Sequence, residues 1–181
     1  MEIRELDKSS LRKQMIKARL DLDSVNYTTK SNFIISKLKQ HPDFIKAKTI
    51  GIYVSFRNEV YTISLIKEML SNKNICVPKI EDKEMNFYQI KSFDELKPNY
   101  MKILEPDNHH FISKDQIDLM IVPIVAYDCF NNRLGYGGGY YDRYLSDYKG
   151  KIIGLAFSFQ KVPLLPVEPF DLPISTIIDE K

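Results

Sequence analysis

Apolar residues follow a helical period at the start of this chain and form strand-like runs further along it. A stripe of apolar residues spaced by three or four predicts a helix over residues 9–22, with Ser9 or Ser10 as its N-cap. A second helix is expected over about 28–40, because His41-Pro42 follows and proline disfavours helix in the residue before it. Runs rich in β-branched and aromatic residues predict strands at 49–55, 74–80, 86–91 (an edge strand), 118–125, 151–157 and 174–178. Further helices are expected at 62–70 and 140–148.

The alternation of strands and helices predicts an α/β fold, layered, with a largely parallel central sheet flanked by helices. Residues 127–139 are expected to form a loop after the most apolar strand. Residues 163–173 hold four of the nine prolines, which predicts an ordered loop without regular structure. The sequence has no internal repeat and no clear linker, so we expect residues 1–181 to form a single domain.

Charge and composition exclude several classes of protein. The 181 residues carry 26 Lys and Arg against 24 Asp and Glu, a net charge of +2, which gives no global argument for binding nucleic acid or an anionic membrane. The longest apolar stretch, 119–127, is far short of the ~20 residues of a spanning helix, and the charged start does not resemble a signal peptide. We therefore expect a cytoplasmic protein, with Cys76 and Cys129 as reduced, packed thiols.

Glycines gather in one short segment. Four of the seven glycines lie between Gly135 and Gly139, after a predicted strand and before a predicted helix. Glycine lets successive backbone N–H groups converge on an anion, and a helix N-terminus adds a positive end. The segment lacks the Lys and hydroxyl of a P-loop, and Tyr140 stands where a dinucleotide-binding loop has its third glycine. The pattern therefore indicates an anion-binding loop, with a purely structural turn as the alternative.

Charged residues beside this loop suit phosphate and magnesium. Arg133 and Arg143 flank it and can fork onto phosphate oxygens, and Asp142 is a suitable hard ligand for Mg²⁺. Lys8 and Arg12 are four residues apart on one face of the first predicted helix. For each of these groups the alternative is an ordinary solvated surface charge. His41, His109 and His110 have no ligand spacing, and no role is assigned to them.

The run from Arg133 to Arg143, RLGYGGGYYDR, resembles the signature of the 5-formyltetrahydrofolate cyclo-ligase family. The resemblance extends to Lys8-Ser-Ser-Leu-Arg12, to Tyr53–Glu59, to the strand at Asp118–Asp128, and to Gly154–Phe157 with Gln160 and Asp171. It implies one cyclo-ligase domain with a fold similar to that of sugar-phosphate isomerases and CoA transferases. It also implies conversion of 5-formyltetrahydrofolate and ATP to 5,10-methenyltetrahydrofolate, ADP and phosphate with Mg²⁺.

The resemblance also implies site residues, with Arg133 and Tyr140 as catalytic residues. Those implied for ATP are Lys8, Ser9, Ser10, Leu11, Arg12, Arg133, Leu134, Gly135, Tyr136, Gly137, Gly138, Gly139, Tyr140 and Tyr141. Those implied for the folate are Val54, Glu59, Tyr136, Gly137, Gly138, Gly139 and Tyr140, and those for magnesium are Asp142 and Asp171. The protein is expected to be a monomer whose partners are these small molecules, with no nucleic acid and no membrane.

Two positions depart from the family pattern. Asn132 stands where glycine is usual, and asparagine is expected to preserve the turn because it tolerates a positive φ. The glycine loop holds no lysine, so Lys8, Arg12, Arg133 and Mg²⁺ are expected to meet the phosphate charge. The alternatives are a sugar-phosphate isomerase or CoA-transferase-like enzyme on the same fold, and a nucleic-acid-binding module that uses the basic first helix.

Overall fold

The computed structural model describes residues 7–107, 109–169 and 171–181. In this part of the chain, the strands form a seven-stranded sheet and two two-stranded sheets. The order in the large sheet is β11 (Thr176–Ile178), β10 (Lys151–Leu155), β7 (Leu119–Pro123), β1 (Thr49–Ile52), β2 (Asn74–Glu81), β3 (Glu84–Ile90) and β6 (Phe111–Ile112). The small sheets pair β4 (Leu96–Pro98) with β5 (Leu104–Pro106) and β8 (Ala126–Tyr127) with β9 (Arg133–Leu134).

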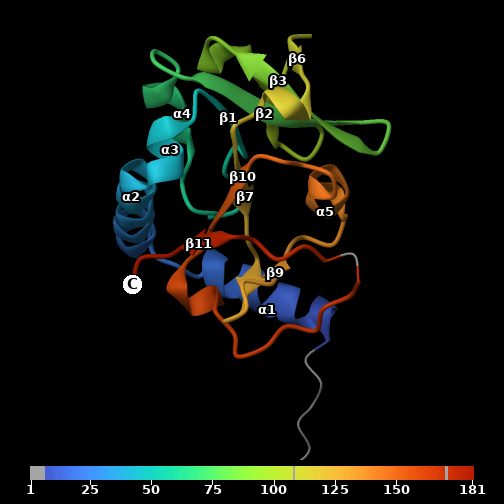
Figure 1. Cartoon of the computed structure of the whole chain (residues 1–181). Helices are drawn as coiled ribbons and strands as arrows, with labels where there is room; N and C mark the ends of the chain where they lie inside the picture. Colours follow the sequence, from blue (N-terminus) through green and yellow to red (C-terminus); the bar gives the residue numbers. More distant parts are fainter. Residues whose placement is uncertain (1–6, 108, 170) are drawn as a thin grey trace, which may run out of the picture.

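Helices cover both faces of the large sheet, which gives three layers (Figure 1). On one side are α2 (Ser24–Gln40), α3 (Pro42–Lys46) and α4 (Ile63–Met69), and on the other is α5 (Tyr140–Leu145). The remaining helix, α1 (Lys8–Leu20), lies below the sheet in that view. The layered α/β fold predicted from the sequence is confirmed.

The centre of the sheet is parallel and one flank is antiparallel. The pairs β11/β10, β10/β7, β7/β1 and β1/β2 are parallel, as predicted. Strand β3 pairs antiparallel with β2, and β6 pairs antiparallel with β3. The prediction that 86–91 is an edge strand is therefore wrong: the two-residue β6, too short to be recognised as a strand from the sequence, pairs with its outer side.

Several boundaries differ from the predicted ones. The N-cap of α1 is Asp7, whose carboxylate accepts the backbone N–H of Ser10 at 3.2 Å, rather than Ser9 or Ser10. Helix α2 begins earlier than predicted, because Asp23 caps it by accepting the Asn26 N–H at 2.9 Å. Helix α5 is shorter than predicted. The hairpin β8–β9 lies in the region predicted as a loop, and α3, β4, β5 and β6 were not predicted.

Apolar residues pack on both faces of the central strands. All five residues of β7 are buried, as its unbroken apolar run predicts. One buried cluster joins the sheet to α2 and α4, a second joins it to α5, and a third holds α1 against β8 and β9 through Leu11 and Met15. At Gly51 in β1 a Cβ would lie 2.7 Å from the Met120 sulfur, so a larger residue there would require the Met120 side chain to shift.

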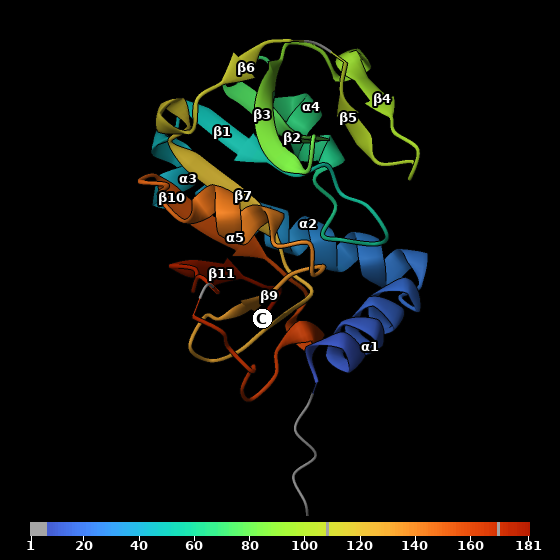
Figure 2. The same cartoon turned by 90° about the vertical axis from the view of Figure 1, so that its right-hand side faces the viewer.

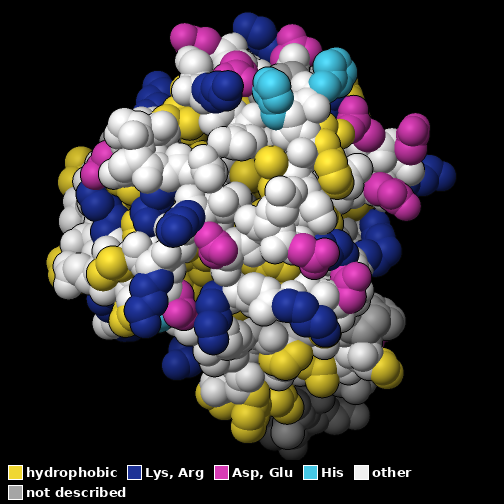
Figure 3. Space-filling model, turned by 45° about the horizontal axis from the view of Figure 1, so that its top comes forward, with side chains coloured by type: hydrophobic (Ala, Val, Ile, Leu, Met, Phe, Trp, Pro, Cys, Tyr) yellow, Lys and Arg dark blue, Asp and Glu magenta, His cyan; other side chains and the backbone are white. Residues whose placement is uncertain are grey.

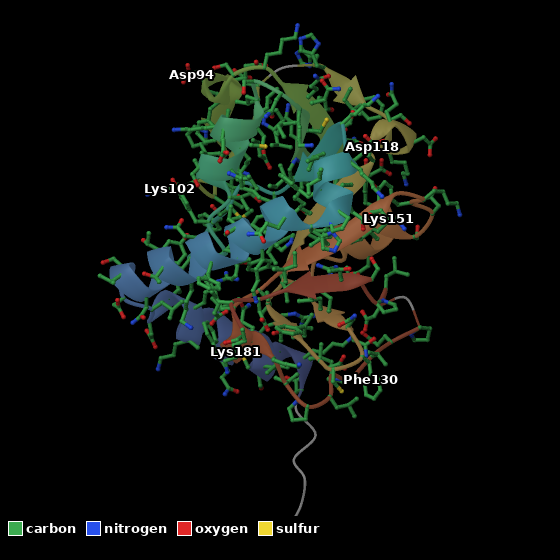
Figure 4. The ribbon with its side chains drawn as sticks, turned by 60° about the vertical axis from the view of Figure 1, so that its left-hand side comes forward. Asp94, Lys102, Asp118, Phe130, Lys151 and Lys181 are labelled. Atoms are coloured by element: carbon green, nitrogen blue, oxygen red, sulfur yellow. The ribbon has the colours of Figure 1, made fainter. Side chains whose placement is uncertain are left out.

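The site lies at the carboxyl ends of the parallel strands. Asp118 and Lys151 lie at the amino ends of β7 and β10 and appear close together in Figure 4. They mark the opposite ends of the parallel strands, away from the site. The turn of hairpin β8–β9 is fixed by Asp128, 1 % exposed, whose carboxylate accepts the N–H groups of Phe130, Asn132 and Leu165 at 2.9–3.0 Å. Asp128 thereby holds both the hairpin that leads to the glycines and the proline-rich segment, which has no regular structure in its described residues.

The two cysteines differ in their surroundings. Both are free, as predicted, and Cys76 is buried, which raises the pKa of its thiol to about 12. Cys129 is exposed in the hairpin turn, so the prediction that it is packed is wrong. None of the helices in the described part of the chain is both long and apolar enough to cross a membrane.

Replacing Tyr148 by phenylalanine is expected to lower the free energy of unfolding by about 1 kcal/mol, because the Tyr148 hydroxyl donates to the Ile117 carbonyl at 2.9 Å. Urea unfolding of Tyr148→Phe beside the unmodified protein measures the difference. An unchanged free energy of unfolding would contradict the expectation.

Candidate active site

A cavity of about 720 Å³ opens at the carboxyl ends of β1 and β7. Its walls come from α1, the segment after β1, the turn between β4 and β5, the glycine loop with the start of α5, and the proline-rich segment. In Figure 2 the β4–β5 hairpin lies above the segment after β1, and α1 lies below it. Figure 4 shows Lys102, in the β4–β5 turn, far from Phe130 at the tip of the other hairpin.

The glycine loop forms one wall through its backbone. Gly137 has a φ of 100° and Gly139 a φ of 66°, both in the left-handed region that favours glycine. The Arg12 side chain covers the loop: its Nε donates to the Gly135 carbonyl at 2.8 Å, and a Cβ on Gly137 would lie 3.3 Å from its Cζ. Arg143 donates to the Gly138 carbonyl at 2.9 Å. Arg12 from α1 and Arg143 from α5 therefore each bind a carbonyl of the glycine loop and hold its backbone in place.

The asparagine that departs from the family pattern does not have a positive φ. The left-handed residue in the hairpin turn is its neighbour Asn131, with a φ of 60°. Asn132 instead donates from Nδ2 to the Asp128 carboxylate at 2.9 Å. The expectation that Asn132 would itself need a positive φ is wrong, because Asn131 makes the reversal one residue earlier.

Arg133 is the buried cation of the site. Its side chain is 3 % exposed, Nη2 pairs with Asp142 Oδ1 at 2.9 Å, and Nη1 donates to the Pro123 carbonyl at 3.3 Å. Its guanidinium also lies 5.5 Å from the centre of the Tyr141 ring. Anchored at the end of β7, the guanidinium stands behind the glycine loop with a fixed orientation.

Lys8 reaches the cavity from the start of α1. Its Nζ lies 2.6 Å from Glu168 Oε2 and 2.6 Å from Asp171 Oδ2. Burial disfavours the charge on Lys8, but the hydrogen bonds to Asp171 and Glu168 outweigh it and raise the pKa of the amine. Lys8 therefore keeps its positive charge at neutral pH.

The segment after β1 adds a buried carboxylate to the cavity lining, next to the glycine loop. Glu59 is 6 % exposed; its Oε2 accepts the Phe56 N–H at 2.8 Å and its Oε1 accepts the Tyr136 hydroxyl at 2.7 Å. Burial raises the pKa of Glu59, and the charge of Arg19 with the hydrogen bonds from Tyr136 and Phe56 opposes this rise. Val54, 7 % exposed, adds apolar surface to the same wall.

Most of the residues that the resemblance implied come together around this cavity. They are Lys8, Arg12, Val54, Glu59, Arg133, Leu134, Gly135, Tyr136, Gly137, Gly138, Gly139, Tyr140, Tyr141, Asp142 and Asp171. Ser9, Ser10 and Leu11 are not among the lining residues: Ser10 is bound to Asp7, and Leu11 is 1 % exposed in the core under α1. Ser10 therefore serves the start of the helix and Leu11 the core, while Ser9 is exposed.

The sequence reasoning missed Arg19 and the β4–β5 turn. Arg19 is 1 % exposed, donates from Nε to the Arg57 carbonyl at 2.9 Å, and donates from Nη2 to the Tyr136 hydroxyl. The sequence feature that could have identified Arg19 is its position on the same helical face as Lys8 and Arg12. The lining segment around Tyr100 and Met101 gave no signal, because only the tertiary fold brings it over the site.

The donor chemistry around the cavity suits a magnesium ion carried with a nucleotide. Asp142 and Asp171 both line the cavity and offer carboxylate oxygens, and each already faces a cation, Arg133 and Lys8. No cluster of three or more metal-ligating side chains occurs among the residues that the structure describes. Mg²⁺ commonly uses one or two carboxylates together with phosphates and water, so the residues present fit this ion.

A glycine loop backed by cations, together with a buried carboxylate and apolar side chains around the same cavity, is an arrangement typical of an enzyme that binds an anionic small molecule. The model of the 5-formyltetrahydrofolate cyclo-ligase family matches residues 4–180. The chain belongs to this family, as the resemblance indicated.

Relatives and solved structures agree with this assignment. The chain is 32% identical to a 5-formyltetrahydrofolate cyclo-ligase of Escherichia coli K12 over 79% of this chain and 84% of that protein. It is also 32% identical to the enzyme of that name from Mycoplasma pneumoniae, over 97% of this chain and all of the relative. The solved 5,10-methenyltetrahydrofolate synthetase of Aquifex aeolicus superposes with a TM-score of 0.88 at 36% identity, over 96% of this chain and 90% of that one. The Mycoplasma pneumoniae synthetase structure gives 0.79 at 28% identity, over 97% of this chain and all of the other.

Proposed function

We propose that this protein is an ATP-dependent ligase that cyclises 5-formyltetrahydrofolate to 5,10-methenyltetrahydrofolate, with ADP and phosphate as the other products. Family membership supports the reaction. The observation that carries the assignment to this cavity is that one cavity is lined both by the glycine loop with Arg12 and Arg133 and by the buried carboxylate of Glu59. The first part of the lining suits a polyphosphate, and the second suits a heterocycle with N–H donors.

The reaction needs no nucleophile from the protein. The formyl oxygen on N5 attacks the γ-phosphorus of ATP, the bond to the bridging oxygen breaks, and ADP leaves. N10 of the substrate then attacks the activated formyl carbon and loses its proton, and the C–O bond breaks to release phosphate. The chain's task is to hold the two substrates in line and to stabilise negative charge on the transferred phosphoryl group.

Each wall takes a distinct part in this task. Arg133 and Lys8 offer positive charge to the phosphates, and the N–H groups of the glycine loop offer hydrogen bonds. Tyr140, whose ring stacks under Arg143 at 5.0 Å, closes the loop end of the cavity next to the reacting groups. Glu59 accepts hydrogen bonds from the N–H groups of the pterin, and Val54 packs against it.

We also propose that Asp142 and Asp171 hold a magnesium ion with the nucleotide. When bound, Mg²⁺ neutralises charge on the phosphate oxygens. Both carboxylates line the cavity that the glycine loop borders, which supports a site beside the phosphates. Each carboxylate would then divide its charge between the ion and its ion-pair partner, Lys8 or Arg133.

Replacing Asp142 by asparagine is expected to raise the concentration of Mg²⁺ needed for half-maximal activity by about tenfold, because one charged ligand is lost. A magnesium titration at saturating ATP measures the shift. The Asp147→Asn variant is the matched control, since Asp147 is exposed beyond the end of α5 and does not line the cavity. A titration identical to that of the unmodified protein would remove Asp142 from the metal site.

The decisive test of the function is an absorbance assay for the methenyl product, with and without ATP and Mg²⁺. Formation of product only when ATP and Mg²⁺ are both present is expected. An isomerase or CoA-transferase-like enzyme on this fold would form no methenyl product with ATP, so a flat trace from folded protein would overturn the proposal.

We further propose that the protein works as a single domain and as a monomer in the cytoplasm, and binds neither nucleic acid nor membranes. Free Cys76 and Cys129 are in keeping with a reducing compartment. On the face seen in Figure 3, Lys and Arg side chains are interspersed with Asp and Glu rather than gathered into a basic patch. That distribution is unlike the electrostatic footprint of a nucleic-acid-binding surface.

A further inference from the structure

Arg19 does not line the cavity, yet with Asp128 it is one of the two most deeply buried charged side chains in the described part of the chain. It projects from the last turn of α1 and is 1 % exposed. Its Nη1 is buried without a hydrogen-bond partner in the described part of the chain. An unmatched buried donor costs about 1–3 kcal/mol, so stability alone is a poor reason for an arginine at this position.

The other two guanidinium nitrogens of Arg19, Nε and Nη2, bind groups in different parts of the site. Nε binds the Arg57 carbonyl at 2.9 Å, in a turn where Arg57 and Asn58 both have left-handed φ values of 47° and 53°. Asn58 returns a hydrogen bond from Nδ2 to the Arg19 carbonyl at 3.2 Å. Nη2 binds the Tyr136 hydroxyl, which in turn donates to Glu59 Oε1 at 2.7 Å. One side chain therefore joins α1, the turn that carries Glu59, and the glycine loop.

Side chains from α1, α2, the end of β1, the glycine loop and α5 surround Glu59, and Arg19 of α1 supplies the positive charge among them. Tyr27 of α2, Tyr53 at the end of β1, Tyr136 of the loop and Tyr141 of α5 all lie near Glu59, and burial raises the pKa of each hydroxyl, so all four are neutral at neutral pH. Within the same turn, the Arg57 guanidinium lies 5.2 Å from the centre of the Phe56 ring. Among the described residues, Arg19 is the cation whose charge acts on Glu59.

We propose that Arg19 is a positioning residue for the cyclo-ligase reaction: through the Tyr136 hydroxyl it holds Glu59 as a charged acceptor for the folate. This inference rests on the proposed function of the cavity. Arg19 acts at a distance from the substrate, and its effect reaches the folate through Tyr136 and Glu59.

The effect on acidity has a definite sign. Arg19 and Tyr136 both lower the pKa of Glu59 against the rise caused by burial. Removing either group therefore raises the pKa of Glu59, and Glu59 takes up its proton at a higher pH than in the unmodified protein. The acid limb of kcat/KM for 5-formyltetrahydrofolate must then move to higher pH.

The test compares Arg19→Met, Arg19→Lys and Tyr136→Phe, with Lys17→Met as the control for loss of one charge from the exposed face of the same helix. In Arg19→Met the KM for 5-formyltetrahydrofolate is expected to rise at least ~10-fold, as befits a lost charged contact, while the KM for ATP changes less than ~2-fold. Arg19→Lys should restore part of this loss. Lys17→Met should match the unmodified enzyme.

A readout that does not depend on turnover separates this inference from the function. The ¹³C shift of the Glu59 carboxyl, followed by NMR against pH, reports its protonation directly, and its midpoint should rise in Arg19→Met and Tyr136→Phe. An unchanged midpoint, or equal rises in KM for both substrates, would overturn the positioning role. Absence of methenyl formation by the unmodified protein would instead refute the function and leave the NMR result standing.

A variant that fails to fold does not end the test. Tyr136 is 43 % exposed, so Tyr136→Phe removes the bridging hydroxyl with little change to the core. The double variant with Arg19→Met should be no worse than the poorer single variant, because both act through one chain of contacts. Fully additive losses in KM would contradict such a chain.

Discussion

Replacing Arg133 by alanine is expected to lower kcat/KM for 5-formyltetrahydrofolate by at least ~100-fold, through loss of about 3 kcal/mol of charge stabilisation at the transferred phosphoryl group. The side chain is 3 % exposed and held by Asp142 and the Pro123 carbonyl, so its charge is oriented before the substrates bind. The guanidinium therefore needs no reorientation when charge develops in the transition state. Steady-state rates at varied concentrations of both substrates measure the loss.

The controls for Arg133 separate charge from packing. Its removal leaves Asp142 without its ion-pair partner, so thermal unfolding must accompany the kinetics. Arg133→Lys keeps the positive charge, but its single amine cannot bind Asp142 and the Pro123 carbonyl in the same geometry. An intermediate rate is therefore expected. Lys149→Met, at an exposed position beyond α5, controls for net charge. Near-normal turnover in folded Arg133→Ala would remove this residue from the catalytic group.

Replacing Gly137 by valine is expected to raise the apparent KM for ATP by ~10- to 100-fold. The φ of 100° is strained for any residue with a Cβ, and the new atom would lie 3.3 Å from Arg12 Cζ. To relieve about 1–3 kcal/mol of backbone strain, the loop would leave the conformation in which its N–H groups converge. Each 1.4 kcal/mol lost in this way lowers the affinity for ATP about tenfold. Nucleotide titration and steady-state kinetics both measure this loss.

The hairpin turn provides the matched control for Gly137. Asn131 has a φ of 60° only a few residues earlier and does not line the cavity, so Asn131→Gly adds backbone freedom without disturbing the loop. Its KM for ATP should be unchanged. If Gly137→Val binds ATP normally, the glycine loop is a structural turn, the alternative that the sequence pattern left open.

Some parts of the site could be read from local sequence because their chemistry is local. The glycine run carries its conformational freedom in its own residues, and Arg133 and Asp142 lie in the same short motif. Glu59 follows a strand that its apolar run predicted, although that strand ends at Ile52 rather than at residue 55, so Val54 also lies beyond it. Arg19 shows the limit: its helical stripe was visible, but its burial and its contact with Tyr136 join residues 117 positions apart.

The sequence alone determined the α/β layers, the parallel centre of the sheet and the place of the glycine loop between a strand and a helix, because periodicity and glycine content act through the nearest residues in the chain. Only the tertiary structure decided that β6 pairs with β3, that Asp128 holds the hairpin, and that the β4–β5 turn covers the cavity. These features depend on packing between distant segments. A two-residue strand or a single buried charge produces no periodic pattern in the sequence. The Arg19–Tyr136–Glu59 contact belongs to the same class, since three segments must fold together before it exists.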